Sequence, residues 1–223
     1  MITPRLQAII NLVTAKTVAD IGTDHAFIPI RLAQDKKITR AIATDKNRGP
    51  IEIARGNVEK YGFSEIIELR YGAGLCPIEK GEVQQIIIAG MGGVLIGDII
   101  EESIDKAKAS ELILQPMNAQ SELRKRLFEM GFKIEVEELS CEGFKVYNLM
   151  RVHFEPQEKR YAEIDLHLPP SLIRHPLWDM LVAKKEREFL KIINGQKQGA
   201  APDYIMLEKY ERLLADLEYI KKG

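Results

Sequence analysis

The sequence predicts an α/β fold in which helices cover a mostly parallel sheet, followed by a helical appendage. Short apolar runs alternate with amphipathic stretches up to about residue 130, which implies parallel strands joined by right-handed crossovers. Two further apolar runs stand close together and predict an antiparallel pair. Beyond them only strongly charged helical patterns follow, which predict the appendage.

Five apolar runs and five helical patterns make up the expected parallel part. We expect helices beginning near Thr3, around Ile30, and over residues 51–61, 94–107 and 121–130. The expected strands are residues 18–21, 41–44, 67–69, 86–89 and 112–114. Residues 132–139 and 145–154 are separated by Cys141, Glu142 and Gly143, a spacing typical of a hairpin. Five parallel units closed by such a hairpin are the architecture of Rossmann-like class I methyltransferases.

At about Pro156 the sequence pattern changes from alternating apolar runs to prolines and charged helical stretches. We therefore predict a first domain over residues 1–156 and a second over 157–223. Three prolines in the second domain indicate a connector, and helical patterns follow over residues 177–194 and 203–222. The turn between them covers residues 195–202. Trp178 and a leucine-rich stripe are expected to pack between the two helices. The appendage is therefore predicted to be a helical hairpin, coiled-coil in type.

Composition excludes some classes of protein. The net charge is −1 with 29% charged residues, so no overall positive field indicates nucleic-acid binding and such contacts must be local. Only two cysteines occur, Cys76 and Cys141, and without a secretory leader they indicate a reducing cytoplasm, where both are expected to be buried or half-buried free thiols. No apolar run approaches the roughly 18 residues of a membrane span. We expect a cytoplasmic monomer.

The most informative segment is residues 20–25, where an apolar strand runs into a turn with one glycine between two acids. Asp20, Gly22, Thr23, Asp24 and His25 belong to it. One glycine is not the three-glycine fingerprint for a pyrophosphate, so a nucleoside ligand without phosphate fits better. The alternative is that Asp20 and Asp24 cap the next helix and that His25 packs half-buried. No second histidine or cysteine lies near enough in sequence to indicate a metal site.

Three other strand ends can be compared with this turn. Asp45, followed by Lys46, stands about twenty residues after the glycine turn, where an acid binds a ribose diol in nicotinamide enzymes and methyltransferases alike. Gly72, Ala73 and Gly74 offer flexible backbone against which an adenine ring could rest.

The fourth strand end contains Ala89, Gly90, Met91, Gly92 and Gly93. Three glycines within four residues cost backbone order, which favours close approach of a ligand to the backbone. The alternative is a tight turn that starts the next helix.

Two basic clusters could hold phosphates if they border the cleft. The first contains Arg31, Lys36 and Lys37. The second contains Lys184, Lys185 and Arg187, for which a solvated helix face is an equally good interpretation.

Three segments together resemble the bacterial family that methylates N1 of adenine 22 in tRNA. They are residues 20–25, residues 89–93, and the run Leu112 to Pro116 followed by Asn118. The resemblance covers nearly the whole chain. It implies S-adenosylmethionine as cofactor, tRNA as substrate, a Rossmann-like catalytic domain and a helical coiled-coil appendage that binds tRNA, with no metal and no membrane.

The residue patterns and the resemblance together lead us to expect the following roles for the residues singled out above. Methyl transfer is assigned to Asp24, His25, Gly90 and Met91. Cofactor binding is assigned to Asp20, Gly22, Thr23, Asp45, Lys46, Gly72, Ala73, Gly74, Ala89 and Gly90. Substrate binding is assigned to Arg31, Lys36, Lys37, Asn118, Lys184, Lys185 and Arg187.

One position departs from the family. An acid usually stands at Ala73 and bonds the adenine amino group of the cofactor, so either a backbone carbonyl near Gly72 or a neighbouring polar side chain substitutes, or cofactor affinity is lower. Other classes stay open: a methyltransferase for another RNA or a small molecule, and a non-enzymatic RNA-binding protein. The single-glycine turn disfavours a nicotinamide dehydrogenase.

Overall fold

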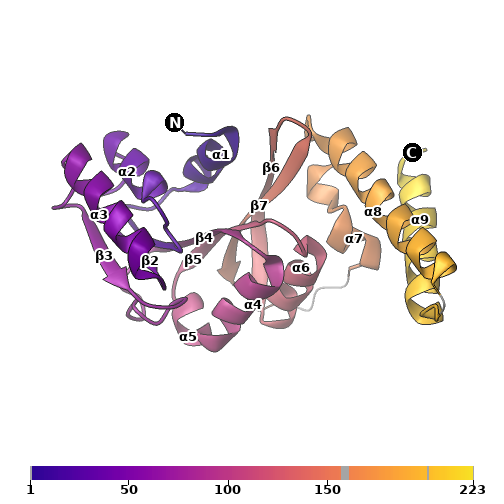
Figure 1. Ribbon diagram of the computed structural model, residues 1–223. Coiled ribbons are helices and arrows are strands. Elements are labelled where there is room, and N and C mark those ends of the chain that lie inside the picture. The colour runs from indigo at the N-terminus through magenta and orange to yellow at the C-terminus, as the bar shows by residue number, and fades with distance from the viewer. Residues whose placement is uncertain (1, 157–160, 200, 223) are drawn as a thin grey trace. The chain divides into compact units, whose positions relative to one another are not determined.

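The computed structural model describes residues 2–156, 161–199 and 201–222. The chain divides into two compact units, Met1–Glu158 and Lys159–Gly223, and the first holds the sheet (Figure 1). The predicted domain boundary after residue 156 adjoins residues 157–160, which lie outside the described residues.

The sheet of the first unit has seven strands in the order β3-β2-β1-β4-β5-β7-β6. β1 to β5 are parallel, and β7 runs antiparallel to both β5 and β6, which confirms the predicted Rossmann-like methyltransferase sheet. The strands are β1 Thr17–Ile21, β2 Arg40–Asp45, β3 Ile67–Tyr71, β4 Gln85–Met91, β5 Glu111–Pro116, β6 Phe132–Glu142 and β7 Lys145–Phe154.

Helices cover both faces of this sheet (Figure 1). They are α1 Pro4–Leu12, α2 Phe27–Gln34, α3 Arg48–Tyr61, α4 Gly93–Glu102, α5 Ile104–Ala107 and α6 Gln120–Glu129. Ile87 faces the helices α1 to α3, whereas Ile86 and Ile88 face α4 to α6. Since both faces are covered, the central strands are apolar throughout rather than alternating, which is why their short runs could be recognised.

The expected helix over residues 94–107 is wrong in one respect, because the structure has two helices there. Ser103 leaves the helical region, with φ −128° and ψ 41°, and its carbonyl accepts the N–H groups of Lys106 and Ala107. Serine favours such a helix-start position over a helix interior.

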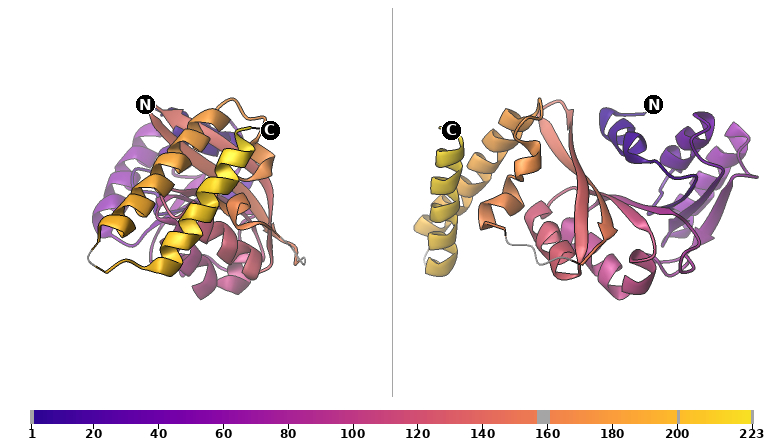
Figure 2. Two further views of the ribbon diagram at one scale, coloured as in Figure 1. Left: turned by 90° about the vertical axis from the view of Figure 1, so that its right-hand side faces the viewer. Right: turned by 180° about the vertical axis from the view of Figure 1, so that it is seen from behind.

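The second unit contains α7 Glu163–His167, a 3-10 turn Pro170–Leu172, α8 Trp178–Gln198 and α9 Tyr204–Ile220. Figure 2 shows α8 and α9 side by side. Phe189 of α8 makes edge contacts with His167 of α7 and with Tyr210 of α9, at ring-centre distances of 5.1 and 5.6 Å. The predicted hairpin of helices is present, and its coiled-coil character stays a prediction.

Three details of the second unit differ from expectation. α8 continues through Gly195 to Gln198, so the turn is shorter than predicted. The short helix α7 and the 3-10 turn were not predicted. The apolar pattern of residues 203–222 predicts that Ile205 packs together with the leucines, but it is 84% exposed, whereas Leu213 and Leu217 are buried.

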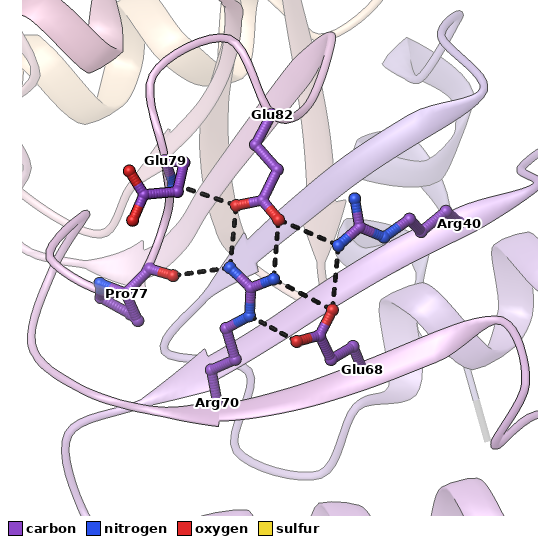
Figure 3. Close-up of polar contacts among 6 residues, drawn as sticks. All are labelled: Arg40, Glu68, Arg70, Pro77, Glu79 and Glu82. Atoms are coloured by element: carbon purple, nitrogen blue, oxygen red, sulfur yellow. Dashed lines mark hydrogen bonds and ion pairs between the residues drawn. The ribbon is translucent and has the colours of Figure 1, made fainter.

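An ion-pair network ties the loop between β3 and β4 to the sheet (Figure 3). The Arg70 guanidinium donates to Glu68 at 2.7 Å, to both carboxylate oxygens of Glu82 at 2.7 and 2.8 Å, and to the Pro77 carbonyl at 2.8 Å. Arg40 donates to Glu68 and Glu82, both at 2.9 Å. Bidentate arginine–carboxylate pairs carry geometric specificity, so the network fixes the loop that begins with Gly72.

The network predicts an acid-sensitive contribution to stability. Hydrogen bonding from Arg70 lowers the pKa of Glu82 from 4.5 to about 2. A lowered pKa stabilises the fold above the ordinary pKa, and this stabilisation is lost as pH falls from 4.5 toward 2. Glu82→Gln should cost about 1 kcal/mol of unfolding free energy at pH 7, and urea titrations should show the difference from wild type shrinking below pH 4.5.

A suitable control is Glu52→Gln, since Glu52 is 68% exposed and lies 3.5 Å from Arg55 in a surface pair. Such pairs contribute little. A Glu82→Gln difference that stays constant across this pH range would contradict the assignment.

Candidate active site

A cavity of 410 Å³ lies at the carboxyl ends of β1 and β4. The strand order reverses between these two strands, and this is where open α/β sheets bind ligands. Its walls come from α1, the turn after β1, the first turn of α2 and the end of β4. Seven of the predicted site residues line it: Asp20, Gly22, Thr23, Asp24, His25, Ala89 and Gly90.

Asp20 is a buried acid at the end of β1. Its side chain accepts a hydrogen bond of 2.6 Å from the Thr23 hydroxyl. Burial is the main cause that raises its pKa from 3.8 to about 6, the negative charge of Asp45 adds to the effect, and the Thr23 hydrogen bond opposes it. The capping alternative is wrong for Asp20 and Asp24, because α2 begins after Ala26 with no side-chain cap.

The turn at Gly22 favours glycine because of its backbone conformation. Its φ is +70°, a left-handed conformation that glycine adopts without strain. A Cβ there would also overlap the terminal methyl of Met91, which packs over the turn from the end of β4. Met91, assigned to methyl transfer, is half-buried and lies outside the residues that line the cavity.

Asp24 and His25 form the polar rim of the cavity. The Asp24 side chain is 64% exposed, and its carboxylate lies 3.3 Å from the His25 ring nitrogen Nε2. The His25 ring stacks on Phe27 with centres 5.1 Å apart and an interplanar angle of 16°. His25 is half-buried and stacked on a neighbouring ring, as the packing alternative expected. Among the described residues no group of three or more His, Cys, Asp or Glu side chains could hold a metal ion.

The residues predicted at the ends of β2 and β3 lie at the same edge of the sheet but not in the cavity wall. Asp45 is buried, and its carboxylate accepts the Asn47 N–H at 2.9 Å. The Gly72 N–H donates to the Asp45 carbonyl at 3.0 Å, which joins the two strand ends. Lys46 and Ala73 are exposed.

The glycines after β4 divide between two roles. Gly90 has φ +78°, lines the cavity, and donates its N–H to the side chain of Gln115 at 3.1 Å. Gly92 and Gly93 instead pack against the turn after β5: a Cβ on Gly92 would lie 2.9 Å from the Asn118 side chain, and the Gly93 N–H donates to the Asn118 carbonyl at 3.1 Å. The tight-turn alternative therefore holds for Gly92 and Gly93, and contacts with Asn118 stabilise this turn.

Sequence reasoning missed Arg5, Phe27 and Gln115. Arg5 reaches the cavity from α1, and its guanidinium donates to Gln115, a fully buried side chain at the end of β5, at 2.8 Å. A glutamine ending an apolar strand was an available signal. Nothing around Arg5 in the sequence marks it, because its partner lies 110 residues away.

Two of the three basic residues predicted to bind phosphates near α2 instead make contacts within the protein. Arg31 pairs with Asp35 at 2.9 Å, and the Lys37 ammonium donates to the Ile10 carbonyl at 3.1 Å, whereas Lys36 is exposed.

In the second unit Lys184 is half-buried and Arg187 is exposed. The Lys185 side chain is only 5% exposed and lies 2.8 Å from Glu188, which contradicts its assignment to a phosphate-binding surface.

The free thiols also differ from expectation, since Cys76 is exposed rather than buried, while Cys141 is half-buried. A search of the described residues for a helix long and apolar enough to cross a membrane finds none.

Fold and cavity together define a methyltransferase. A family model described as a methyltransferase domain matches residues 2–150. A curated relative, the tRNA (adenine(22)-N(1))-methyltransferase of Bacillus subtilis, is 36% identical over 164 residues, which cover 73% of this chain and 69% of the relative. The chain belongs to the family of tRNA (adenine(22)-N(1))-methyltransferases.

Solved structures agree with this membership. The B. subtilis M1A22 tRNA methyltransferase TrmK superposes with a TM-score of 0.88 and 27% identity, covering 99% of this chain and 98% of its own. A Streptococcus pneumoniae protein solved in complex with S-adenosyl-L-methionine superposes with a TM-score of 0.85 and 31% identity, covering 99% of both chains.

The raised pKa of Asp20 predicts a stability cost. An acid whose pKa rises from 3.8 to about 6 on folding destabilises the fold as pH rises through that interval. Asp20→Asn should therefore be more stable than wild type at pH 8 by up to about 3 kcal/mol, with the gap closing toward pH 4. Thermal or urea unfolding across this range measures the effect.

The matched control is Glu65→Gln, which removes an exposed carboxyl from the same unit and should change stability by less than about 0.5 kcal/mol. An Asp20→Asn variant whose stability follows wild type at every pH would contradict the buried-acid interpretation.

Proposed function

We propose that this protein transfers a methyl group from S-adenosylmethionine to N1 of adenine 22 in tRNA, acting as a cytoplasmic monomer. The observation that carries the proposal is the cavity at the β1–β4 switch point in a chain of this family. We assign catalysis to residues 1–156 and tRNA binding to residues 157–223.

The site fits the proposed cofactor. S-adenosylmethionine supplies an electrophilic methyl group on a sulfonium and carries a ribose diol but no phosphate. Asp45, buried at the end of β2, can accept hydrogen bonds from a diol. The turn that begins with Gly72 is joined to Asp45 and is assigned to the adenine ring. Asp20 and the backbone at Gly22 and Gly90 are assigned to binding the remaining part of S-adenosylmethionine.

Positioning accounts for most of the catalysis we propose. N1 of adenine has a lone pair in the ring plane, so no base has to remove a proton before attack. The protein must hold the two reactants in line and exclude competing orientations. Methylated adenine carries a positive charge, and we assign Asp24, with His25 beside it at the rim, to stabilise that charge as it develops.

The second unit presents a basic stripe suited to tRNA phosphates. Lys184, Arg187 and Lys191 recur on one face of α8, and the latter two are exposed. The neighbouring acids are engaged elsewhere: Glu186 pairs with Lys221 at 2.9 Å and Glu188 pairs with Lys185. The exposed charges of Arg187 and Lys191 are therefore available to a phosphate despite the acidic residues between them.

The direct test is incubation with labelled S-adenosylmethionine and bulk bacterial tRNA, followed by nucleoside analysis and mapping of the methylated position. We expect label in 1-methyladenosine at position 22. Asp24→Asn should lower the single-turnover rate at saturating cofactor by about tenfold or more without changing cofactor affinity.

Label at another position, in another RNA or in a short metabolite would reassign the substrate. Absence of transfer to any acceptor would favour a non-enzymatic RNA-binding protein. An unchanged single-turnover rate would remove Asp24 from the catalytic residues.

The basic stripe makes a separate prediction. Replacing Lys184, Arg187 and Lys191 together by glutamate should raise the KM for tRNA by about tenfold and flatten its salt dependence, because fewer counterions are released on binding. Cofactor affinity, measured without RNA, should not change. Steady-state assays at several salt concentrations test this.

Arg212→Glu is the control, since Arg212 lies on α9 outside the stripe and its side chain is 72% exposed. It should change KM by less than about twofold. A triple variant with wild-type KM and salt dependence would exclude the stripe from tRNA binding.

A further inference from the structure

The hairpin of β6 and β7 carries at its turn an exposed aromatic side chain that the proposed function does not use. Phe144 is 98% exposed, more than any other large apolar residue that the structure describes. Single exposed apolar residues are common on protein surfaces, so exposure alone indicates nothing. The place of the ring in the fold therefore decides what it could bind.

The turn presents Phe144 on a short, paired support. Glu142 pairs with Lys145 across the hairpin, so the connection consists of Gly143 and Phe144 alone. Gly143 has φ +59°, and glycine at the first position of a two-residue loop is a pattern that tight hairpins favour. The last four residue pairs before the turn form an unbroken ladder. The ring is therefore held at a defined place rather than on a long loop.

The turn lies at the same edge of the sheet as the cavity. β5 ends at Pro116, beside the end of β4. β7 runs antiparallel to β5 with Leu114 opposite Met150, and continuing this register places Asn148 opposite Pro116. The three residues from there to Lys145, at about 3.3 Å each, carry the turn roughly 10 Å beyond the end of β5. Phe144 thus projects past the edge where the ligand is expected.

The hairpin also contacts a helix that lines the cavity. Glu142 accepts the backbone N–H of Arg5 at 3.2 Å, and the Arg5 guanidinium lies 5.5 Å from the ring centre of Tyr147. Arg5 and Leu6 of α1 belong to the cavity wall. Figure 1 shows the turn of the hairpin at the upper end of β6, next to α1. Phe144 is therefore two residues away from a side chain that contacts the cavity wall.

A nucleobase is the partner that fits an exposed ring at this place. N1 of adenine belongs to the edge that pairs with another base, so the target adenine has to leave its stack. The neighbouring base then loses a stacking partner, and aromatic side chains stack on unpaired bases whatever their sequence. Lys145, exposed next to Phe144, supplies a positive charge for an adjacent phosphate.

We propose that Phe144 stacks on a tRNA base that flanks the target adenine and so positions the RNA over the cavity. The proposal rests on the function proposed above and adds to it an RNA contact from the first unit. One ring and one lysine offer far less surface than the roughly 800 Å² per partner of a stable protein interface. A single unpaired base matches their size and charge.

The test measures methylation of bacterial tRNA by Phe144→Ala and Phe144→Trp. Loss of stacking on one base should lower kcat/KM for tRNA by roughly tenfold to a hundredfold in Phe144→Ala. Phe144→Trp keeps an aromatic face and should stay within about threefold of wild type. Affinity for S-adenosylmethionine, measured without RNA, should not change in either variant, because Phe144 lies outside the cavity wall.

A modified substrate separates stacking from other effects of the substitution. A tRNA with abasic sites on both sides of adenine 22 removes the proposed stacking partner. On this substrate wild type and Phe144→Ala should have equal kcat/KM. Thermal unfolding should not distinguish the variants from wild type, since the side chain is 98% exposed.

Tyr61→Ala is the matched control, because it removes another exposed aromatic ring from the same unit. Tyr61 is the last residue of α3, which leads from the carboxyl end of β2 back to the start of β3. It therefore lies at the opposite edge of the sheet from the cavity. Its removal should change kcat/KM for tRNA by less than about twofold.

Four results would overturn the proposal. Wild-type kcat/KM in Phe144→Ala would exclude the ring from RNA binding while leaving the proposed function in place. Equal losses in Phe144→Ala and Phe144→Trp, or a loss that persists on the abasic substrate, would exclude stacking on a flanking base. Unchanged tRNA kinetics, with loss of binding to phosphatidylglycerol vesicles, would assign the ring to a lipid surface. A wild-type chain that methylates no tRNA would contradict the proposed function itself, and this proposal with it.

Discussion

The structure depends on one electrostatic constraint: two acids, Asp20 and Asp45, are buried at the ends of neighbouring parallel strands. The pairing of Ile21 with Thr44 sets β1 and β2 in register, so both strands deliver their acids to the same edge of the sheet. Burying like charges there opposes folding, as the raised pKa of Asp20 shows. Two apolar clusters, one on each face of the sheet, offset this cost. The apolar packing of the fold thus compensates for the free-energy cost of the two buried acids at this edge of the sheet.

That edge is made rigid by contacts between its turns. The Met91 side chain packs over Gly22, Asn118 contacts Gly92, and Gln115 accepts hydrogen bonds from both Gly90 and Arg5. Farther along, the Arg70 network holds the loop after β3 (Figure 3). Each turn is thereby restrained by a different element. Such mutual support suits a reaction in which orientation rather than proton transfer is the main difficulty.

The sequence correctly predicted those features of the fold that a local pattern of residues determines. Apolar runs located the strands, since strands covered on both faces leave no other pattern, and the acids of residues 20–25 stood out against such a run. What depends on distant partners was missed: Arg5 is held at the cavity by Gln115, and Lys185 is buried by packing that a charged helical pattern does not reveal. For Gly92 and Gly93 the sequence predicted ligand approach where the structure shows packing. Packing against the turn after β5 requires small residues just as ligand approach does.

The same reasoning separates the two acids of the first turn. Asp20 is buried, bonded to Thr23 and shifted in pKa, which are the properties of a group that holds a ligand's charge in a fixed place. Asp24 is exposed and has φ +53°, which places its carboxylate on the rim beside His25. Alkylation of an in-plane lone pair needs no tuned base, so the raised pKa of Asp20 fits the cofactor-binding role proposed for it. On the proposed roles, a buried acid with a raised pKa marks ligand binding rather than catalysis in this cavity.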